Sequence, residues 1–369
     1  MARRLANGCV ALVVFGAAVG LLTLLFWGDG MPSDAPRTPA SATAIPLAVL
    51  GDSGSHAYQD SLQLADPAAR GGPNRARTFQ WTEVLGRMRG QQIDQGPFVR
   101  WGRPGVVERA REVLGLPSAR APQKEDYLYN FANSGASCRN LMGTRFRQAP
   151  RLVALMDRDP KLWERGVVVI GIGGNDWSAF LDTEANNPSD PALIAANNFC
   201  IDEIRRAIAL IRASHPSTRI VIVGLAGEAD DPFSQHRWQT AAETANIRMS
   251  LGRFNEQLRQ ITVGDPRMAF FDHLRWLNQL IGGRTDRGQR DYKAFNIGPK
   301  LRITNTIGDD PHNTVMKDDH NGVALNALWA QSLAQLLVDS FGLPVKPISE
   351  DELARFLEPL FEQSRAPGS

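Results

Sequence analysis

The sequence predicts an α/β fold, a three-layer α/β/α sandwich around a mostly parallel central sheet. Two observations carry this prediction: short apolar or β-branched runs recur along the chain, and helical stretches separate them. Such runs are typical of strands that are buried on both faces of a parallel sheet. The five predicted strands are 45–50, 127–132, 167–170, 220–223 and 268–271.

Two stretches between or after these strands have the spacing of an amphipathic helix. In both, large apolar side chains recur every three or four residues, which places them on one face. We assign these faces to the core and not to a cofactor site. The first stretch leads into the strand at 220–223 and carries Ile201, Ile204, Ile208 and Ile211; the second carries Leu325, Leu328, Trp329, Leu333, Leu336 and Leu337.

The first 44 residues differ in composition from the rest. Residues 1–27 have a short basic start and then an apolar run, which is long enough to cross a hydrocarbon core and longer than the apolar part of a usual signal peptide. We expect an uncleaved transmembrane anchor, with the folded body periplasmic or extracellular. Cleavage near 41–44 would instead give a secreted protein. Residues 28–44 are rich in Pro, Ser and Ala, as in a flexible tether.

Residues 45–369 are long enough for one enlarged domain. Within it, the stretch 58–115 contains several Gly-Gly, Gly-Pro and Trp positions and no clear periodicity. We predict an insertion here. Such a segment either lines a substrate cleft or is merely structural, and the sequence leaves both open.

Charge and cysteine content exclude some classes of protein. The chain has 41 Lys and Arg against 39 Asp and Glu, so no strong field favours a nucleic-acid partner. Cys138 and Cys200 are compatible with a disulfide in an oxidising compartment, but two unpaired buried thiols are the favoured interpretation. No histidine and cysteine spacing matches a zinc site, and we expect no cofactor.

Three polar clusters directly follow predicted strands. They are 51–55 (GDSGS), 133–137 (NSGAS) and 171–176 (GIGGND). Because ligands bind beyond the carboxyl ends of parallel strands, these clusters are expected to meet at one edge of the sheet. Ser53 offers a hydroxyl, Gly135 allows a backbone N–H to approach an oxyanion closely, and Asn175 offers an amide donor.

This order of motifs resembles the SGNH, or GDSL, hydrolase superfamily over roughly residues 45–338. The resemblance implies a flavodoxin-like fold and an esterase or lipase activity without a cofactor. It also implies that Ser53 is the nucleophile, and that Ser53, Gly135 and Asn175 form the oxyanion hole. A late histidine would be the base, oriented by an aspartate, while Asp52 shapes the turn.

Two pairs of residues compete for the roles of base and acid. The family block is Asp, two residues, then His, and Asp309 with His312 has this spacing. However, the family histidine stands just before the last helix, and the predicted helix begins right after His320, where Asp318 lies two residues earlier. We favour Asp318 and His320, with Asp309 and His312 as the alternative pair.

Other functional classes fit less well. A chymotrypsin-like protease places its histidine before the serine, and no histidine precedes Ser53. A metal-dependent phosphoesterase would need a second histidine block near the early strands. A non-catalytic envelope protein that binds acylated glycan or lipid remains the alternative to the enzyme. We therefore expect a serine esterase acting on a small-molecule, lipid or glycan ester, attached to the membrane through its N-terminal segment.

Overall fold

The computed structural model describes residues 41–143, 145–234, 236–285 and 287–362. The predicted anchor at 1–27 and most of the predicted tether lie outside these residues. Within the described ranges, no helix is long and apolar enough to span a bilayer. Residues 41–44, the end of the predicted tether, lie against the domain: Ala44 is buried, and Arg165 donates hydrogen bonds to the carbonyls of Ala42 and Ala44 at 2.9 and 3.1 Å.

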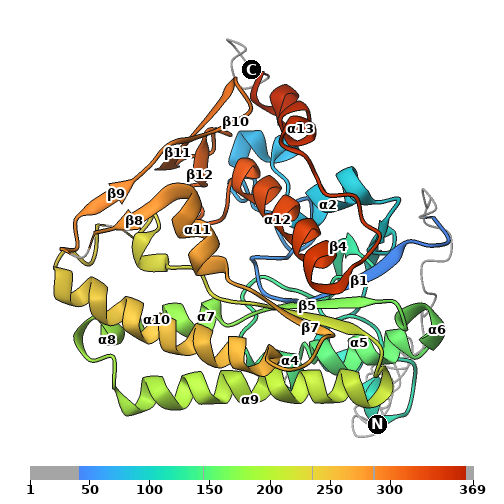
Figure 1. Ribbon diagram of the computed structural model, residues 1–369. Helices are drawn as coiled ribbons and strands as arrows, with labels where there is room; N and C mark the ends of the chain where they lie inside the picture. Colours follow the sequence, from blue (N-terminus) through green and yellow to red (C-terminus); the bar gives the residue numbers. More distant parts are fainter. Residues whose placement is uncertain (1–40, 144, 235, 286, 363–369) are drawn as a thin grey trace, which may run out of the picture.

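A five-stranded, wholly parallel sheet forms the centre of the fold (Figure 1). Its strands, in spatial order, are β2 (Ile93–Asp94), β1 (Ile45–Gly51), β5 (Val167–Gly171), β6 (Arg219–Val223) and β7 (Met268–Phe271). Four of the five predicted strands are therefore present. Along β1, Ala48 and Leu50 enter one core cluster and Leu47 and Val49 the other, because successive side chains point to opposite faces.

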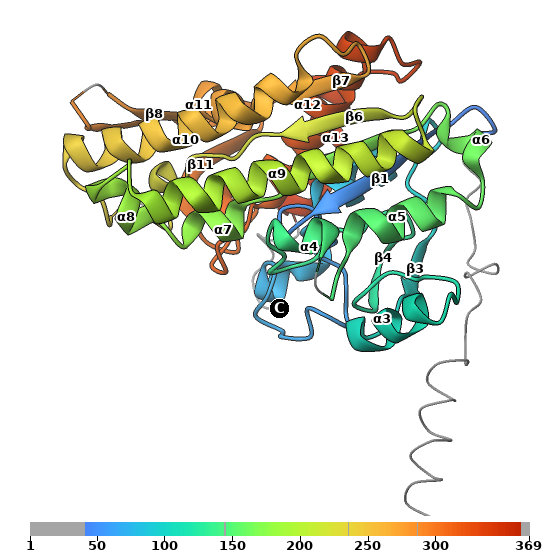
Figure 2. The same cartoon turned by 90° about the horizontal axis from the view of Figure 1, so that it is seen from below.

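Helices cover both faces of this sheet, which confirms the predicted three layers (Figures 1 and 2). One face carries α4 (Arg139–Met142), α5 (Gln148–Met156), α9 (Pro191–Ser214) and α10 (Ala241–Thr262). The other carries α2 (Trp81–Arg89), α11 (His273–Ile281), α12 (Val323–Phe341) and α13 (Glu350–Glu362). The two predicted helical stripes lie in α9 and α12, where most of their apolar residues are buried.

Shorter elements surround the sandwich. Three small sheets are formed by β3 (Phe98–Trp101) with β4 (Lys124–Tyr127), by β8 (Gly282–Arg284) with β9 (Arg290–Tyr292), and by β10 (Phe295–Ile297), β11 (Leu301–Ile307) and β12 (Asn313–Val315). The remaining short helices are η1 (Gly72–Arg77), α3 (Gly105–Val113), α6 (Pro160–Trp163), α7 (Gly174–Ser178), α8 (Leu181–Asn186) and η2 (Glu228–Asp230).

The strand predicted at 127–132 is wrong. Residue Tyr127 ends β4, and the chain then turns and meets β1 through a parallel bridge between Asn130 and Val49. The Gln148 side chain explains the difference, because its amide oxygen accepts the Gly51 N–H at 2.8 Å. That N–H is the next donor of β1, so it is not available to continue the ladder with the 127–132 segment. The segment nevertheless delivers residues 133–137 to the end of β1.

The predicted insertion at 58–115 is in part integral to the core. Its strand β2 forms one edge of the central sheet, and its helix α2 packs against α12 through Trp81 and Trp329, whose ring centroids are 4.9 Å apart. Trp81 is fully buried. The stretch before α2 and the first residue of α2, Trp81, reach the polar cluster at 51–55.

The expectation of two unpaired thiols is also wrong, because Cys138 and Cys200 form a disulfide. The two residues are 62 positions apart and come from the start of α4 and from α9. Both are buried, as expected, but α4 packs against α9 and brings the sulfurs together.

Candidate active site

The three polar clusters meet at the carboxyl ends of β1 and β5. Gly51 at the end of β1 is paired with Gly171 of β5, and a Cβ on Gly51 would lie 2.5 Å from the Gly171 carbonyl oxygen. Only glycine permits this close approach of the two backbones. The Gly51 carbonyl also accepts a hydrogen bond from the N–H of Asn133 at 3.1 Å. The loops that follow the strands therefore start side by side.

Ser53 lies in a turn that α2 holds from outside. The Asp52 carboxylate accepts a hydrogen bond from the Gly54 N–H at 2.9 Å, which closes the turn. The side chains of Gln80 and Trp81 donate to the carbonyls of Ser53 and Gly54 at 3.2 and 3.1 Å. Ser53 is partly exposed, and none of the described residues hydrogen-bonds its hydroxyl. The turn thus presents a free hydroxyl to solvent.

Ser53, Asn175 and His320 line one pocket of about 310 Å³. Most of its remaining wall comes from the ends of β5 and β6 and from the residues around His320. The pocket also includes Trp329, which the sequence assigned to the core, and five residues that the sequence did not assign to the site, namely Tyr58, Ser178, Asp231, His273 and Asp319. Nothing in their local sequence marks them, since they come from elements far apart in the chain.

His320 has one ring nitrogen engaged and the other free. Its Nδ1 lies 2.6 Å from the backbone carbonyl oxygen of Asp318, a contact that requires the proton on Nδ1. No described residue hydrogen-bonds Nε2, so this nitrogen remains available to accept a proton. His320 and Ser53 both line the pocket, but no hydrogen bond joins their side chains.

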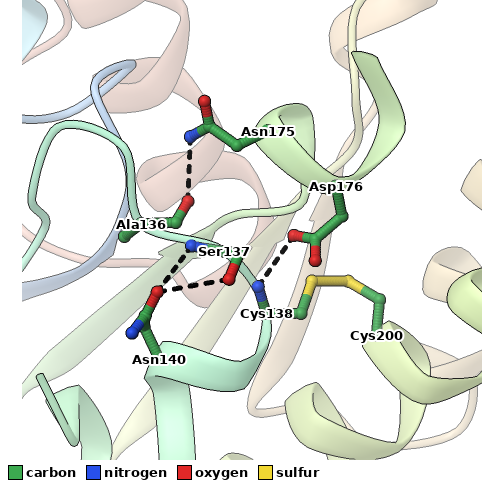
Figure 3. The surroundings of a disulfide bond; sticks show 7 residues. All are labelled: Ala136, Ser137, Cys138, Asn140, Asn175, Asp176 and Cys200. Atoms are coloured by element: carbon green, nitrogen blue, oxygen red, sulfur yellow. Dashed lines mark hydrogen bonds between the residues drawn. A yellow bond between two sulfur atoms is a disulfide. The ribbon is translucent and has the colours of Figure 1, made fainter. Parts of the chain in front are cut away.

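Asn175 and Asp176 hold the loop that contains Gly135 (Figure 3). The Asn175 amide donates to the Ala136 carbonyl at 2.8 Å, and the Asp176 carboxylate accepts from the Cys138 N–H at 2.8 Å. The Cys138–Cys200 disulfide ties the same loop to α9. Because an amide nitrogen carries two hydrogens, Asn175 keeps one donor for the pocket.

Gly135 directly precedes Ala136, the residue whose carbonyl accepts the hydrogen bond from Asn175. Its φ of +73° lies in the left-handed region that favours glycine, and it is exposed. It does not itself line the pocket of Ser53. Its neighbour Ser134 donates its N–H to Nδ1 of His56 at 3.1 Å, which fixes the loop from the other side.

The alternative pair, Asp309 and His312, lies away from this pocket. Nδ1 of His312 donates to the Arg302 carbonyl at 2.8 Å, and the ring packs edge-on against Phe361. Asp309 accepts from the Lys317 N–H at 3.2 Å and pairs with the Lys317 ammonium group. The structure brings neither residue to Ser53.

Several carboxyl groups around the pocket have shifted pKa values. Burial raises the pKa of Asp52 to about 6 and that of Asp231 to about 7, and it also raises the pKa of Asp319. Burial acts in the same direction on Asp318, but the His320 imidazole, 3.5 Å away, and the backbone N–H and guanidinium of Arg70 hold the pKa of Asp318 well below its usual range. Asp318 is therefore the carboxylate that is firmly ionised beside His320.

A comparison with models of known families gives a match. The GDSL-like Lipase/Acylhydrolase family matches residues 98–288, slightly more than half of the 369-residue chain. The matched range contains Gly135 and Asn175 and ends before His320. A search of curated proteins found no match.

Two solved structures are similar to the chain. The lipase Lip_vut3 from a goat rumen metagenome is 15% identical, with a TM-score of 0.34 over 67% of this chain and 90% of that one. A protein from Parabacteroides merdae ATCC 43184 described as a GDSL-like lipase is 14% identical, with a TM-score of 0.33 over 84% of this chain and 100% of that one.

Proposed function

Because the chain belongs to the GDSL-like lipase/acylhydrolase family, we propose that it is a serine esterase in which Ser53 attacks the carbonyl carbon of a carboxylic ester. The observation that carries the proposal is the pocket shared by Ser53, Asn175 and His320. A hydroxyl, a free imidazole nitrogen and an amide donor are the groups that acyl transfer to water requires.

The reaction proceeds in two steps. Nε2 of His320 takes the Ser53 proton while the serine oxygen bonds to the ester carbon, and His320 then protonates the leaving alcohol. Water, activated by the same nitrogen, next hydrolyses the acyl-enzyme and frees Ser53. The N–H groups of Ser53 and Gly135 and the Asn175 amide stabilise the oxyanion in both steps.

A serine-reactive fluorophosphonate probe tests the proposal. Folded wild-type protein should be labelled, and Ser53→Ala should not. Ser332→Ala is the matched control, since the Ser332 hydroxyl accepts a hydrogen bond from Trp276 at 2.8 Å outside the pocket, and its loss should not affect labelling. Absent labelling of folded protein, or equal labelling of Ser53→Ala, would favour a non-catalytic protein that binds acylated glycan or lipid.

The location of the enzyme is part of the proposal. We place the folded body outside the cytoplasm, attached through residues 1–27, so that lipid or glycan esters of the envelope are within reach. The Cys138–Cys200 disulfide supports this placement, because disulfides persist in oxidising compartments. Digestion of intact cells or spheroplasts with an external protease should degrade the domain. A domain protected until the cytoplasm is opened would contradict this location.

A further inference from the structure

Arg70 is a nearly buried arginine between the Ser53 turn and α2, and only 5% of its surface is exposed. Its backbone φ is +53°, a conformation that side chains rarely adopt and that surrounding contacts must stabilise. The guanidinium lies against the Tyr58 ring at 5.3 Å. Its other contacts lead to two loops of the candidate active site.

On one side Arg70 binds the loop that carries His320. Its Nη1 and its backbone N–H donate to the same carboxylate oxygen, Oδ2 of Asp318, at 2.6 and 2.8 Å. Nη1 also lies 3.0 Å from Nδ1 of His320. Since that ring nitrogen already donates to the Asp318 carbonyl, the guanidinium acts on the imidazole as a nearby positive charge and not as a hydrogen-bond partner.

On the other side Arg70 binds the loop that carries Gly135. Its Nη2 donates to the Ser134 hydroxyl at 3.3 Å, and that hydroxyl lies 2.9 Å from Nδ1 of His56. Nε2 of His56 then donates to Asp60 at 2.7 Å. Each group therefore donates a hydrogen bond to the next one, from Arg70 to Ser134, from Ser134 to His56, and from His56 to Asp60.

The Ser134, His56 and Asp60 array has the composition of a catalytic triad but not its accessibility. His56 and Asp60 are completely buried, and Ser134 does not line the pocket of Ser53. Burial lowers the pKa of His56 to about 4, and its Nδ1 already accepts the Ser134 backbone N–H. The array is therefore an anchor for the Gly135 loop.

We propose that Arg70 is a positioning residue that joins the loop carrying His320 to the loop carrying Gly135. It holds Asp318 beside His320 and Ser134 beside Gly135. This inference rests on the proposed esterase function. Asp318 lies 248 residues from Arg70, and Ser134 lies 64 residues from it. One rigid guanidinium fork thus connects three segments that are far apart in the sequence.

Arg70 also contributes charge to the surroundings of His320. The other titratable groups there are Asp52 from the β1 turn, Tyr58 beside Arg70, Asp318 and Asp319 from the histidine loop, and Asp231 and His273 across the pocket. The carboxylates favour a positive imidazolium, and the guanidinium opposes it. Removal of the Arg70 charge therefore leaves the carboxylates unopposed at the imidazole.

Arg70→Met tests the proposal by its effect on the pH profile. Methionine keeps the volume but removes the charge, so the acid limb of kcat/KM should move to higher pH by about one unit. Because the side-chain hydrogen bonds to Asp318 and Ser134 are also lost, kcat at the optimum pH should fall by about 10- to 100-fold. Arg70→Lys keeps a positive charge but lacks the two guanidinium nitrogens that bind Asp318 and Ser134. It should therefore lower kcat while leaving the acid limb in place. Wild-type kcat and pH profile in Arg70→Met would overturn the role of Arg70.

Arg151→Met is the matched control. Arg151 is equally buried and donates to Glu112 and to two backbone carbonyls, but it does not line the pocket. Its replacement should change stability without moving the acid limb. The same shift in both variants would show a general effect of losing a buried arginine, and would also overturn the proposal.

Ser134→Ala keeps the proposal testable if Arg70→Met does not fold. It removes the link from Arg70 to the Gly135 loop alone, so kcat should fall by about 10-fold with the acid limb unchanged. Wild-type kcat in folded Ser134→Ala would refute the coupling of the two loops. Failure of the esterase function itself is recognised separately, because wild-type protein would then hydrolyse no ester, or Ser53→Ala would hydrolyse the ester as fast as wild type.

Discussion

Nδ1 of His320 lies closer to the backbone carbonyl oxygen of Asp318, at 2.6 Å, than to the Asp318 carboxylate, whose nearer oxygen is 3.5 Å away. With one residue between the two, the carboxylate turns toward Arg70 and the peptide carbonyl accepts the Nδ1 proton. The backbone carbonyl of Asp318 therefore determines that Nδ1 of His320 carries the proton, while the Asp318 carboxylate contributes a negative charge.

Asp318→Asn should accordingly be a mild variant. The carbonyl still orients His320, so we expect kcat to fall by about 10- to 100-fold, and not by the factor of about 10⁴ that follows loss of a sole orienting carboxylate. Steady-state kinetics of Asp318→Asn and His320→Ala would check this. A loss as large as that of His320→Ala would mean that the carboxylate orients the base.

The two candidate bases should differ sharply. His320→Ala should lower kcat by at least about 1000-fold, because it removes the only imidazole in the pocket of Ser53 apart from His273, which stacks on Trp329. His312→Ala should leave kcat unchanged and cost about 1 kcal/mol of stability for the lost hydrogen bond to Arg302. Hydrolysis of p-nitrophenyl esters of increasing chain length measures both. Loss of activity in His312→Ala alone would assign the base to the Asp309 and His312 pair.

Asn175→Ala should lower kcat by about 100-fold or more with the fold intact, since it removes an oxyanion donor. Asn246→Ala is a matched control, because Asn246 likewise donates to a backbone carbonyl at 2.8 Å, that of Ala185, but outside the pocket. It should retain wild-type kcat. An unchanged kcat in Asn175→Ala would remove Asn175 from the catalytic site.

The double variant Cys138→Ser, Cys200→Ser should be less stable by up to about 4 kcal/mol, because the disulfide closes a loop of 62 residues. Its kcat should fall only a few-fold, since Asn175 and Asp176 still hold the loop. Urea unfolding and kinetics would measure the two effects. Unfolding at the same urea concentration as wild type would show that the disulfide does not stabilise the domain.

Asp52 should make the domain more stable in mild acid than at neutral pH. Burial raises its pKa from 3.8 to about 6, so between these values the native state keeps a proton that the unfolded chain has lost. The contribution of Asp52 to stability is therefore present below pH 3.8 and is lost as the pH rises through 6. Asp52→Asn should be more stable than wild type by up to about 3 kcal/mol at pH 8. Urea unfolding at several pH values checks this, and parallel stability curves for the two proteins would contradict it.

Much of the fold could be predicted from the sequence because burial leaves local patterns. The strands at 45–50, 167–170, 220–223 and 268–271 are apolar on both faces, and α9 and α12 carry apolar stripes. The sequence also predicted that the clusters containing Ser53, Gly135 and Asn175 meet at one edge of the sheet, since parallel strands end at the same edge.

Only the tertiary structure decided how these residues are held. The segment at 127–132 failed as a strand because the Gln148 side chain accepts the Gly51 N–H with which the ladder would have continued. The disulfide, the carbonyl that orients His320 and the contacts of Arg70 depend on packing between distant segments. Apolar periodicity reports which face of an element is buried, but it does not report which side chain from another part of the chain will lie against it.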